Sequence, residues 1–380
     1  MDYFITNYGL ECPAGARRAV LEDSIMQKGR PVTAGSKILE NFISPLDATV
    51  VTLLEAAGIT ILGKTKMDEF GIAGLFADLE ATDKNESTEF ISGAVSAVAD
   101  GAADFALCND YTGAVRAVAA ARGLCYIHPS YGTVSRYGLI HAVSSMDQIG
   151  IVCKTPADGF QVLSVIAGTD SKDGAMYQDP APQAESVRNT NSIRIGVPRN
   201  VFARIAEPES AVFNAKNTEL VEFELKYFDA YAQVMRILCS AEISSNITRY
   251  DGIKFGYRSD GFRDLHGLYT QSRTQALGPH AKLAAIFGSM VLSQGYYDEY
   301  YDKAMRIRRL IKESLEFDKY DAIVLPASSS SPDYRLALHA LPQLCGLPAA
   351  TIPSPGGGIT LIAEARNERG LAAILEALGD

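Results

Sequence analysis

The 380-residue sequence contains no tryptophan, and none of its six cysteines belongs to a C-x-x-C pair. Scattered cysteines of this kind favour reduced thiols in a cytoplasmic protein and argue against a disulfide framework or a structural zinc site. The five histidines are isolated as well, and no H-E-x-x-H motif occurs. We therefore predict neither a metal site nor any other cofactor.

Long apolar runs and an excess of positive charge are missing too. No uninterrupted apolar stretch approaches the roughly 18–20 residues of a membrane span, and the first residues lack the basic-then-apolar layout of a signal peptide. The formal net charge of −10 disfavours general binding to nucleic acid or to an anionic membrane. We expect a cytoplasmic protein that contacts neither a membrane nor nucleic acid directly.

What the sequence does contain is an alternation of short apolar strands and amphipathic helices. Ser44 and Pro45 are typical of a helix start, and Gly58 of its end. Thr155 and Pro156 predict another start of this kind. The predicted strands cover 59–62, 105–108, 193–198, 321–326 and 359–365, and the predicted helices 44–58, 92–101, 156–168, 292–316 and 371–378.

This order of elements predicts an α/β fold with a large mixed central sheet covered by helices. The length allows a large core. We expect a single domain over residues 1–380, with residues 192–320 as the candidate for a smaller lobe.

Eight sequence blocks carry a resemblance to a known family. They are MQKGRPVTAGSKILENF (26–42), GKTKMDEFGIAG (63–74), PSYGTVSRYGLI (129–140), VSSMDQIGIVCKT (143–155), EISSNITRYDGIKFGYRS (242–259), GYYDEYYDKAMRIRRLIK (295–312), CGLPAATIPSP (345–355) and GITLIAEA (358–365). In these blocks the sequence resembles the amidase-signature family, and within it the A subunits of glutamine-dependent tRNA amidotransferases. The blocks follow the family's order over nearly the whole chain, although the usual N-terminal helical segment has no counterpart here.

The resemblance implies a Ser-cisSer-Lys triad, in which a neutral lysine takes a proton through a relay serine from a nucleophilic serine. The lysine segment matches ARRAVLEDS (16–24) and places Glu22 at the base. The relay loop matches STEFISGA (87–94) and places Phe90 at the relay serine. The nucleophile motif matches DYTGAVR (110–116) and places Ala114 at the nucleophile.

The same resemblance places the substrate-binding residues at positions that have lost their charge. An arginine that holds the glutamine carboxylate falls at Ala284, and an aspartate that pairs with the glutamine ammonium falls near Leu336. Neither side chain can make a charge-assisted hydrogen bond. The five changes together imply a pseudoenzyme, a structural or regulatory paralogue that binds a protein partner or forms a homo-oligomer.

Two other hypotheses stay open. The chain could be an active amidase or amidotransferase subunit that releases ammonia through a rebuilt site made of Ser92, Thr112 and Glu22. It could also be a ligand-binding module, in which Phe90 narrows the former substrate pocket and favours a small apolar ligand.

Three further features are interpreted as structural. Lys64 lies in one of the blocks that carry the resemblance but not at the base position, and His128 is a single histidine without a partner in sequence. The tyrosines at positions 296, 297, 300 and 301 have helical spacing, which predicts a packed helix face, with a partner surface as the alternative.

Overall fold

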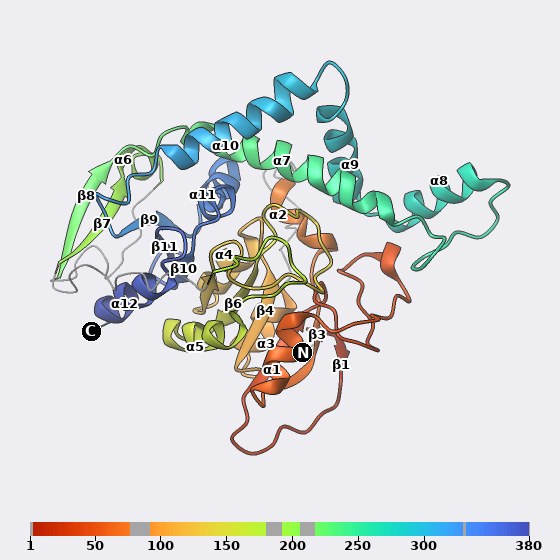
Figure 1. Ribbon diagram of the computed structural model, residues 1–380, viewed down its shortest axis with the longest axis horizontal. Coiled ribbons are helices and arrows are strands. Elements are labelled where there is room, and N and C mark those ends of the chain that lie inside the picture. Colours follow the sequence, from red (N-terminus) through yellow and green to blue (C-terminus); the bar gives the residue numbers. More distant parts are fainter. Residues whose placement is uncertain (1–2, 77–91, 180–191, 206–216, 330–331, 380) are drawn as a thin grey trace.

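The computed structural model describes residues 3–76, 92–179, 192–205, 217–329 and 332–379. In these ranges the strands join one mixed sheet in the order β1-β3-β2-β4-β6-β5-β10-β11-β9-β7-β8 (Figure 1). The strands are β1 (Phe4–Asn7), β2 (Arg18–Glu22), β3 (Thr60–Thr65), β4 (Phe105–Asn109), β5 (Cys125–His128), β6 (Ile149–Cys153), β7 (Ile193–Pro198), β8 (Thr218–Phe223), β9 (Ala322–Pro326), β10 (Ala349–Ile352) and β11 (Ile359–Ile362).

Helices cover both faces of this sheet. The α-helices are α1 (Thr49–Ala56), α2 (Ala73–Phe76), α3 (Gly93–Ala99), α4 (Ala114–Ala121), α5 (Pro156–Ile166), α6 (Arg199–Phe202), α7 (Tyr231–Asn246), α8 (Leu265–Ala276), α9 (Pro279–Val291), α10 (Lys303–Glu313), α11 (Pro332–Cys345) and α12 (Glu368–Gly379). Short 3-10 helices lie at Lys37–Leu39, Glu69–Gly71, Phe228–Ala230 and Ile247–Arg249, and a π-helix at Tyr297–Asp302. Within the described ranges, no helix is both long and apolar enough to cross a membrane.

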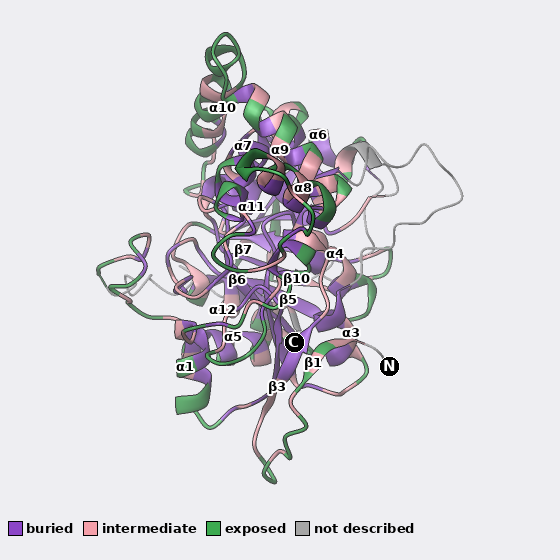
Figure 2. Ribbon diagram, turned by 90° about the vertical axis from the view of Figure 1, so that its right-hand side faces the viewer, coloured by how far each residue is buried: buried purple, intermediate pink, exposed green. Residues whose placement is uncertain are grey.

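Successive residues of a strand point to opposite faces of the sheet, so the apolar core consists of separate clusters on the two faces. Val20 of β2 and Ala106 of β4 pack in one apolar cluster with α3 and α4. Their neighbours Leu21 and Leu107 pack on the other face with α1, α5 and α12. A third and larger cluster joins α7, α9 and α11 to the sheet. Figure 2 shows the buried strands at the centre and exposed residues along outer helices such as α10.

The structure confirms the predicted α/β fold with a large mixed sheet covered by helices on both faces. Thr155 is the N-cap of α5 and Pro156 its first residue, as predicted, because the Thr155 hydroxyl accepts the backbone N–H of Asp158. The assignment of residues 1–380 to one domain, with or without a smaller lobe, stays a prediction.

Two predicted helix boundaries are wrong. The first helix does not start at Ser44, because the Ser44 hydroxyl donates to the Leu46 carbonyl in a turn and α1 begins only at Thr49. The helix predicted over 292–316 is also interrupted. α9 ends at Val291, Gly295 has a left-handed φ of +91°, and α10 begins only at Lys303 after a π-helix.

The tyrosines before α10 therefore do not form one packed face. Tyr296, Tyr297 and Tyr300 are exposed, whereas Tyr301 alone is partly buried against the large cluster. The prediction of a packed face is wrong for three of these four residues, because the π-helix turns them out of the 3.6-residue periodicity.

Candidate functional site

The ends of two parallel strands form the candidate site. β2 and β4 are hydrogen-bonded in parallel with Leu21 opposite Leu107, so their carboxyl ends lie at the same edge of the sheet. Glu22 is the last residue of β2 and lies on the face of α3 and α4. Its Oε1 accepts hydrogen bonds from the Ser24 hydroxyl at 2.6 Å and the Asn109 backbone N–H at 3.2 Å. This edge therefore brings the predicted base position next to the end of β4.

Burial controls the charge of Glu22. Desolvation raises the pKa of this carboxyl to about 8, against the lowering effect of its two hydrogen bonds. The nearby carboxyl groups of Asp68 and Asp110 raise it further because they disfavour another negative charge. Glu22 is therefore mainly protonated at neutral pH, and a protonated carboxyl cannot take a proton from a nucleophile.

Lys64 of β3 is the cation of this site. Its side chain is fully buried, and its Nζ has no hydrogen-bond partner among the described residues. Desolvation lowers the pKa of Lys64 to about 8, while the charge of Asp23, and that of Glu22 when it is ionised, act in the opposite direction. The structure thus places the lysine that we interpreted as structural in the electrostatic environment of Glu22, a proximity that the sequence did not reveal. Its structural role stays a prediction.

The turn after β4 carries Ala114, the predicted nucleophile position. Gly113 adopts a left-handed conformation with a φ of +81° and is the N-cap of α4, so that Ala114 is the first residue of the helix. Thr112 and Ala114 lie close against the Gly74 backbone of α2. A Cβ added to Gly74 would lie 2.5 Å from Thr112 Oγ1 and 3.0 Å from Ala114 Cβ. The side chain at the predicted nucleophile position is therefore the methyl group of Ala114, which packs against α2.

A buried ion pair holds the same turn. Asp110 accepts hydrogen bonds at 3.1 Å from the backbone N–H groups of Val115 and Arg116 and from Arg116 Nε. Arg116 is fully buried, and its Nη2 lies 3.4 Å from His128 Nδ1. Burial and the Arg116 charge hold the pKa of His128 well below its usual value. These contacts agree with a structural His128, although its role stays a prediction.

The relay position falls outside the described residues, because Phe90 lies in the range 77–91. Its neighbour Ser92 is the N-cap of α3, where its Oγ accepts the Val95 backbone N–H at 3.3 Å. In the part of the chain that the structure describes, no hydrogen bond joins Ser92 to Glu22 or Thr112. The structure therefore does not assemble these three candidates into a hydrogen-bonded triad.

Comparison with known proteins matches residues 19–340 to the family model described as Amidase. The chain is 38% identical to the A subunit of glutamyl-tRNA(Gln) amidotransferase from Lachnoclostridium phytofermentans, over 84% of this chain and 69% of that protein. It is 34% identical to the protein of the same name from Lachnospira eligens, over 95% of this chain and 79% of that protein. The chain belongs to the amidase family.

A solved amidase-family structure confirms the fold. The A subunit of glutamyl-tRNA(Gln) amidotransferase from Thermotoga maritima superposes with a TM-score of 0.74 and 24% sequence identity, over 99% of this chain and 86% of that chain. The resemblance stated from the sequence blocks is therefore confirmed for the family and for its similarity to these A subunits.

Within this amidase fold, the two predicted substrate-binding positions lie in the large apolar cluster. Ala284 of α9 is fully buried and Leu336 of α11 is 4% exposed. Tyr111, from the turn before α4, belongs to the same cluster, and its hydroxyl donates to the Phe70 carbonyl at 3.0 Å. Neither Ala284 nor Leu336 offers a charge to a polar substrate.

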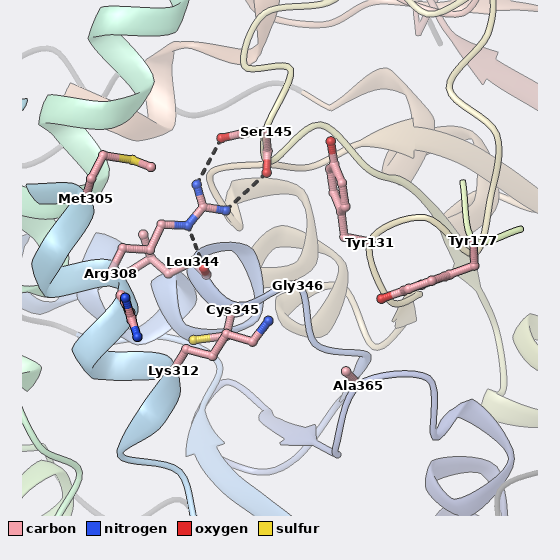
Figure 3. A pocket seen from close by; sticks show the side chains of 11 residues that line it. Tyr131, Ser145, Tyr177, Met305, Arg308, Lys312, Leu344, Cys345, Gly346 and Ala365 are labelled. Atoms are coloured by element: carbon pink, nitrogen blue, oxygen red, sulfur yellow. Dashed lines mark hydrogen bonds between the residues drawn. The ribbon is translucent and has the colours of Figure 1, made fainter. Parts of the chain in front are cut away.

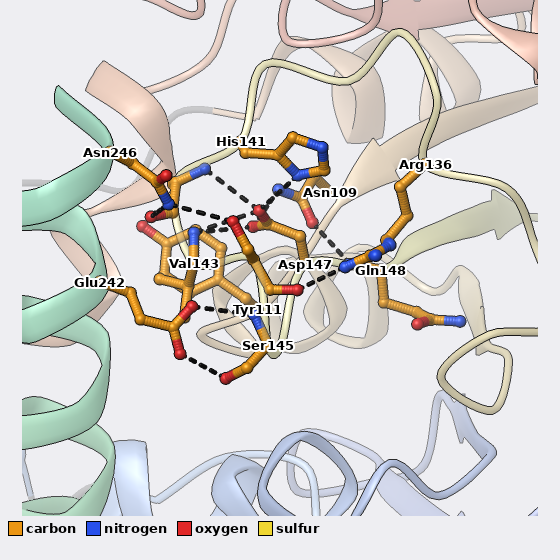
Figure 4. A network of polar contacts seen from close by, with 12 residues as sticks. Asn109, Tyr111, Arg136, His141, Val143, Ser145, Asp147, Gln148, Glu242 and Asn246 are labelled. Carbon is orange, nitrogen blue, oxygen red and sulfur yellow. Dashed lines mark hydrogen bonds and ion pairs between the residues drawn. The ribbon is translucent and has the colours of Figure 1, made fainter. Parts of the chain in front are cut away.

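A polar network behind the amidase site was not predicted from the sequence. Asp147 is fully buried and accepts hydrogen bonds from Asn109 Nδ2 at 2.9 Å and the Val143 backbone N–H at 3.1 Å (Figure 4). Its other oxygen lies 3.1 Å from His141 Nδ1. Since the Asn109 main chain donates to Glu22, this network fixes the strand end that carries the site. Asp147 lies in the mixed segment VSSMDQI (143–149), and its spacing in the sequence gave no signal of these partners.

The raised pKa of Glu22 leads to a prediction about stability. The folded chain keeps this proton up to about pH 8, whereas an unperturbed glutamate releases it near 4.5. The folded state therefore binds more protons between these values, and the free energy of unfolding falls as the pH rises. Glu22→Gln removes this titration and keeps the acceptor oxygen. We expect it to be about 4–5 kcal/mol more stable than the wild type at pH 9 and within about 1 kcal/mol of it at pH 5.

Urea unfolding of both proteins at several pH values measures this difference. The control is Glu11→Gln at an exposed position, which should follow the wild-type curve throughout. Parallel pH profiles for Glu22→Gln and the wild type would mean that Glu22 is ionised in the folded chain.

Proposed function

We propose that this amidase-family chain is a pseudoenzyme that acts by binding and not by amide hydrolysis. The observation that carries the proposal is the methyl group of Ala114 at the position of the nucleophilic serine, packed against Gly74. Acyl transfer requires an oxygen or sulfur nucleophile with an adjacent base. Alanine supplies no such atom.

The surrounding groups support the same conclusion. Glu22 is mainly protonated at neutral pH and is already hydrogen-bonded to Ser24 and Asn109. Removing a nucleophile that works as part of a unit lowers the rate by a factor on the order of 10⁶. Restoring only one member of the unit returns little of that loss, because the remaining members still lack their partners.

The substrate positions also support loss of the glutamine reaction. An arginine at Ala284 and an acidic group at Leu336 would hold the charges of an amino acid, but both sites belong to a closed apolar cluster. A zwitterion placed there would lose its hydration without gaining charged partners.

Ammonia release tests the proposal. We expect the purified chain to release none above the buffer blank from glutamine, asparagine or simple amides. Ala114→Ser should stay inactive because the base and relay positions are unchanged. An amidase that is active on the same amides is the positive control. Turnover by the unmodified chain would contradict the proposal.

The partner of such a pseudoenzyme is proposed from its relatives, which are named as subunits of an amidotransferase. We infer that the chain binds another subunit of an assembly of this kind, or a second copy of itself, in the cytoplasm. Size-exclusion chromatography with light scattering, with and without the other amidotransferase subunits of the same organism, tests this. A stoichiometric complex that persists in high salt is expected, and a lone monomer in every mixture would contradict it.

The alternative is an active amidase with a rebuilt site, and one observation favours it. Lys64 is buried, has a pKa lowered to about 8 and has no hydrogen-bond partner among the described residues, which are properties of a catalytic base. In that case the chain would release ammonia, and Lys64→Met together with Ser92→Ala or Thr112→Val would abolish it.

A further inference from the structure

A cavity of about 400 Å³ lies between α10 and the end of α11, and it shares no residue with the candidate site. Its size is in the range of small-molecule sites. Figure 3 shows α10 with its cationic side chains on one side and two tyrosines on the other. The residues that line it are Tyr131, Ser145, Tyr177, Met305, Arg308, Arg309, Lys312, Leu344, Cys345, Gly346 and Ala365.

Arg308 forms a rigid wall of this cavity. Its Nε donates to the Leu344 carbonyl at 2.7 Å, its Nη1 to the Ser145 hydroxyl at 3.1 Å and its Nη2 to the Ser145 carbonyl at 3.3 Å (Figure 3). These contacts tie α10 to the end of α11 and to the loop before β6. Each nitrogen of the guanidinium thus already donates to the protein, so Arg308 shapes the cavity more than it binds a ligand.

The two tyrosines are also held in place. The Tyr131 hydroxyl donates to the Ser144 carbonyl at 2.9 Å and accepts from Arg136 Nη1 at 2.8 Å. The Arg366 guanidinium lies 4.2 Å from the centre of the Tyr177 ring. The rings therefore offer mainly their apolar surfaces, and the cavity is built before any ligand enters.

Two cations at the wall of the cavity remain available. Lys312 is exposed and forms no ion pair with another described residue, and Figure 3 shows its side chain extending along Cys345. Among the described residues, Arg309 forms an ion pair only with Glu313 of the same exposed helix surface, at 2.7 Å. Such exposed pairs contribute little and exchange readily with other anions. Burial raises the pKa of the Cys345 thiol to about 12, so the Cys345 side chain adds no negative charge to the cavity.

We propose that this cavity binds a small carboxylate with a compact apolar body, such as an aromatic acid. The carboxylate would lie on Lys312 and Arg309, and the body would lie among Met305, Leu344 and the tyrosine rings. A neutral ligand would leave the Lys312 ammonium without an anionic partner, and a bare inorganic anion would leave the apolar walls in contact with water.

The charge around the cavity supports an anionic ligand on a chain whose net charge is −10. α10 bears five cationic side chains and one carboxylate, namely Lys303, Arg306, Arg308, Arg309, Lys312 and Glu313. At physiological ionic strength charges beyond about 8 Å are largely screened, so the local cations and not the net charge govern binding.

Isothermal titration calorimetry with 1-naphthaleneacetate tests the proposal on the full chain. The matched probes are 1-naphthaleneethanol, which lacks the charge, and acetate, which lacks the apolar body. We expect saturable binding of 1-naphthaleneacetate that is at least tenfold tighter than binding of either control probe. Equal affinity for the alcohol, or no saturable binding of 1-naphthaleneacetate, would overturn the proposal.

Two variants locate the site. Lys312→Gln should weaken 1-naphthaleneacetate about tenfold, whereas Lys319→Gln, an exposed lysine that does not line the cavity, should leave it unchanged. Ala365→Leu should weaken 1-naphthaleneacetate by filling the space for its body. Binding that survives both Lys312→Gln and Ala365→Leu would show that the acid binds elsewhere and would also overturn the proposal.

Discussion

Gly113→Ala is expected to destabilise the fold by about 3–5 kcal/mol, the largest effect that we predict for a single methyl group. Gly113 has a φ of +81°, which favours glycine. An added Cβ would also lie 2.2 Å from His339 Cβ on the buried side of α11. Either α4 or α11 must move to relieve this contact, and both carry part of the core.

The matched control is Gly123→Ala, at the other end of α4. Gly123 has a similar φ of +71°, but a Cβ there would meet nothing within 4 Å. Gly123→Ala should lower the free energy of unfolding only by the cost of placing alanine in the left-handed conformation, about 1–2 kcal/mol. Urea unfolding of the two variants separates backbone strain from the clash. Equal losses for both would mean that the turn before α4 has room for a side chain.

Asp110→Ala is expected to destabilise the chain by about 3–5 kcal/mol, because it leaves the fully buried Arg116 without its ion pair. It also removes the acceptor for the backbone N–H groups of Val115 and Arg116 at the start of α4. The double variant Asp110→Ala with Arg116→Leu should recover part of the loss, since no charge then stays buried.

The control pair lies at the other end of the same helix. Arg122 and Asp100 are 3.5 Å apart, and their side chains are 48% and 24% exposed. Asp100→Ala should change the free energy of unfolding by less than about 1 kcal/mol, because exposed pairs contribute little. Thermal unfolding followed by circular dichroism measures both variants. A loss for Asp110→Ala as small as that for Asp100→Ala would contradict the buried ion pair.

Much of the fold could be predicted from short signals that act locally. Thr155 and Pro156 start α5 because capping depends on two neighbouring residues, and β4 follows from a run of apolar residues between turns. The boundaries at Ser44 and over 292–316 were wrong because the backbone adopts another local structure there. The Ser44 hydroxyl bonds its own turn, and a π-helix replaces the first turns of the expected long helix.

For the candidate site, the sequence could predict only which side chains are chemically unable to act as nucleophile, relay or base. The residue types of Glu22, Phe90 and Ala114 are visible in the sequence, and their assignment to the three catalytic positions of the family stays a prediction. The raised pKa of Glu22 follows from burial, and so does the position of the Lys64 amine, which has no hydrogen-bond partner in the described part of the chain; residue spacing does not report burial. The Asp147 network was missed for the same reason, since its partners come from separate segments.

The most direct test of the pseudoenzyme proposal is acyl transfer to hydroxylamine. An amidase that forms an acyl-enzyme from an amide passes the acyl group to hydroxylamine and yields a hydroxamate, which is detected as its coloured iron(III) complex. With glutamine, asparagine and simple amides, the proposal predicts no hydroxamate above a blank without protein, while an amidase that is active on the same amides serves as the positive control. Hydroxamate formed by the unmodified chain and lost in Ser92→Ala or Thr112→Val would contradict the proposal and establish a rebuilt amidase site.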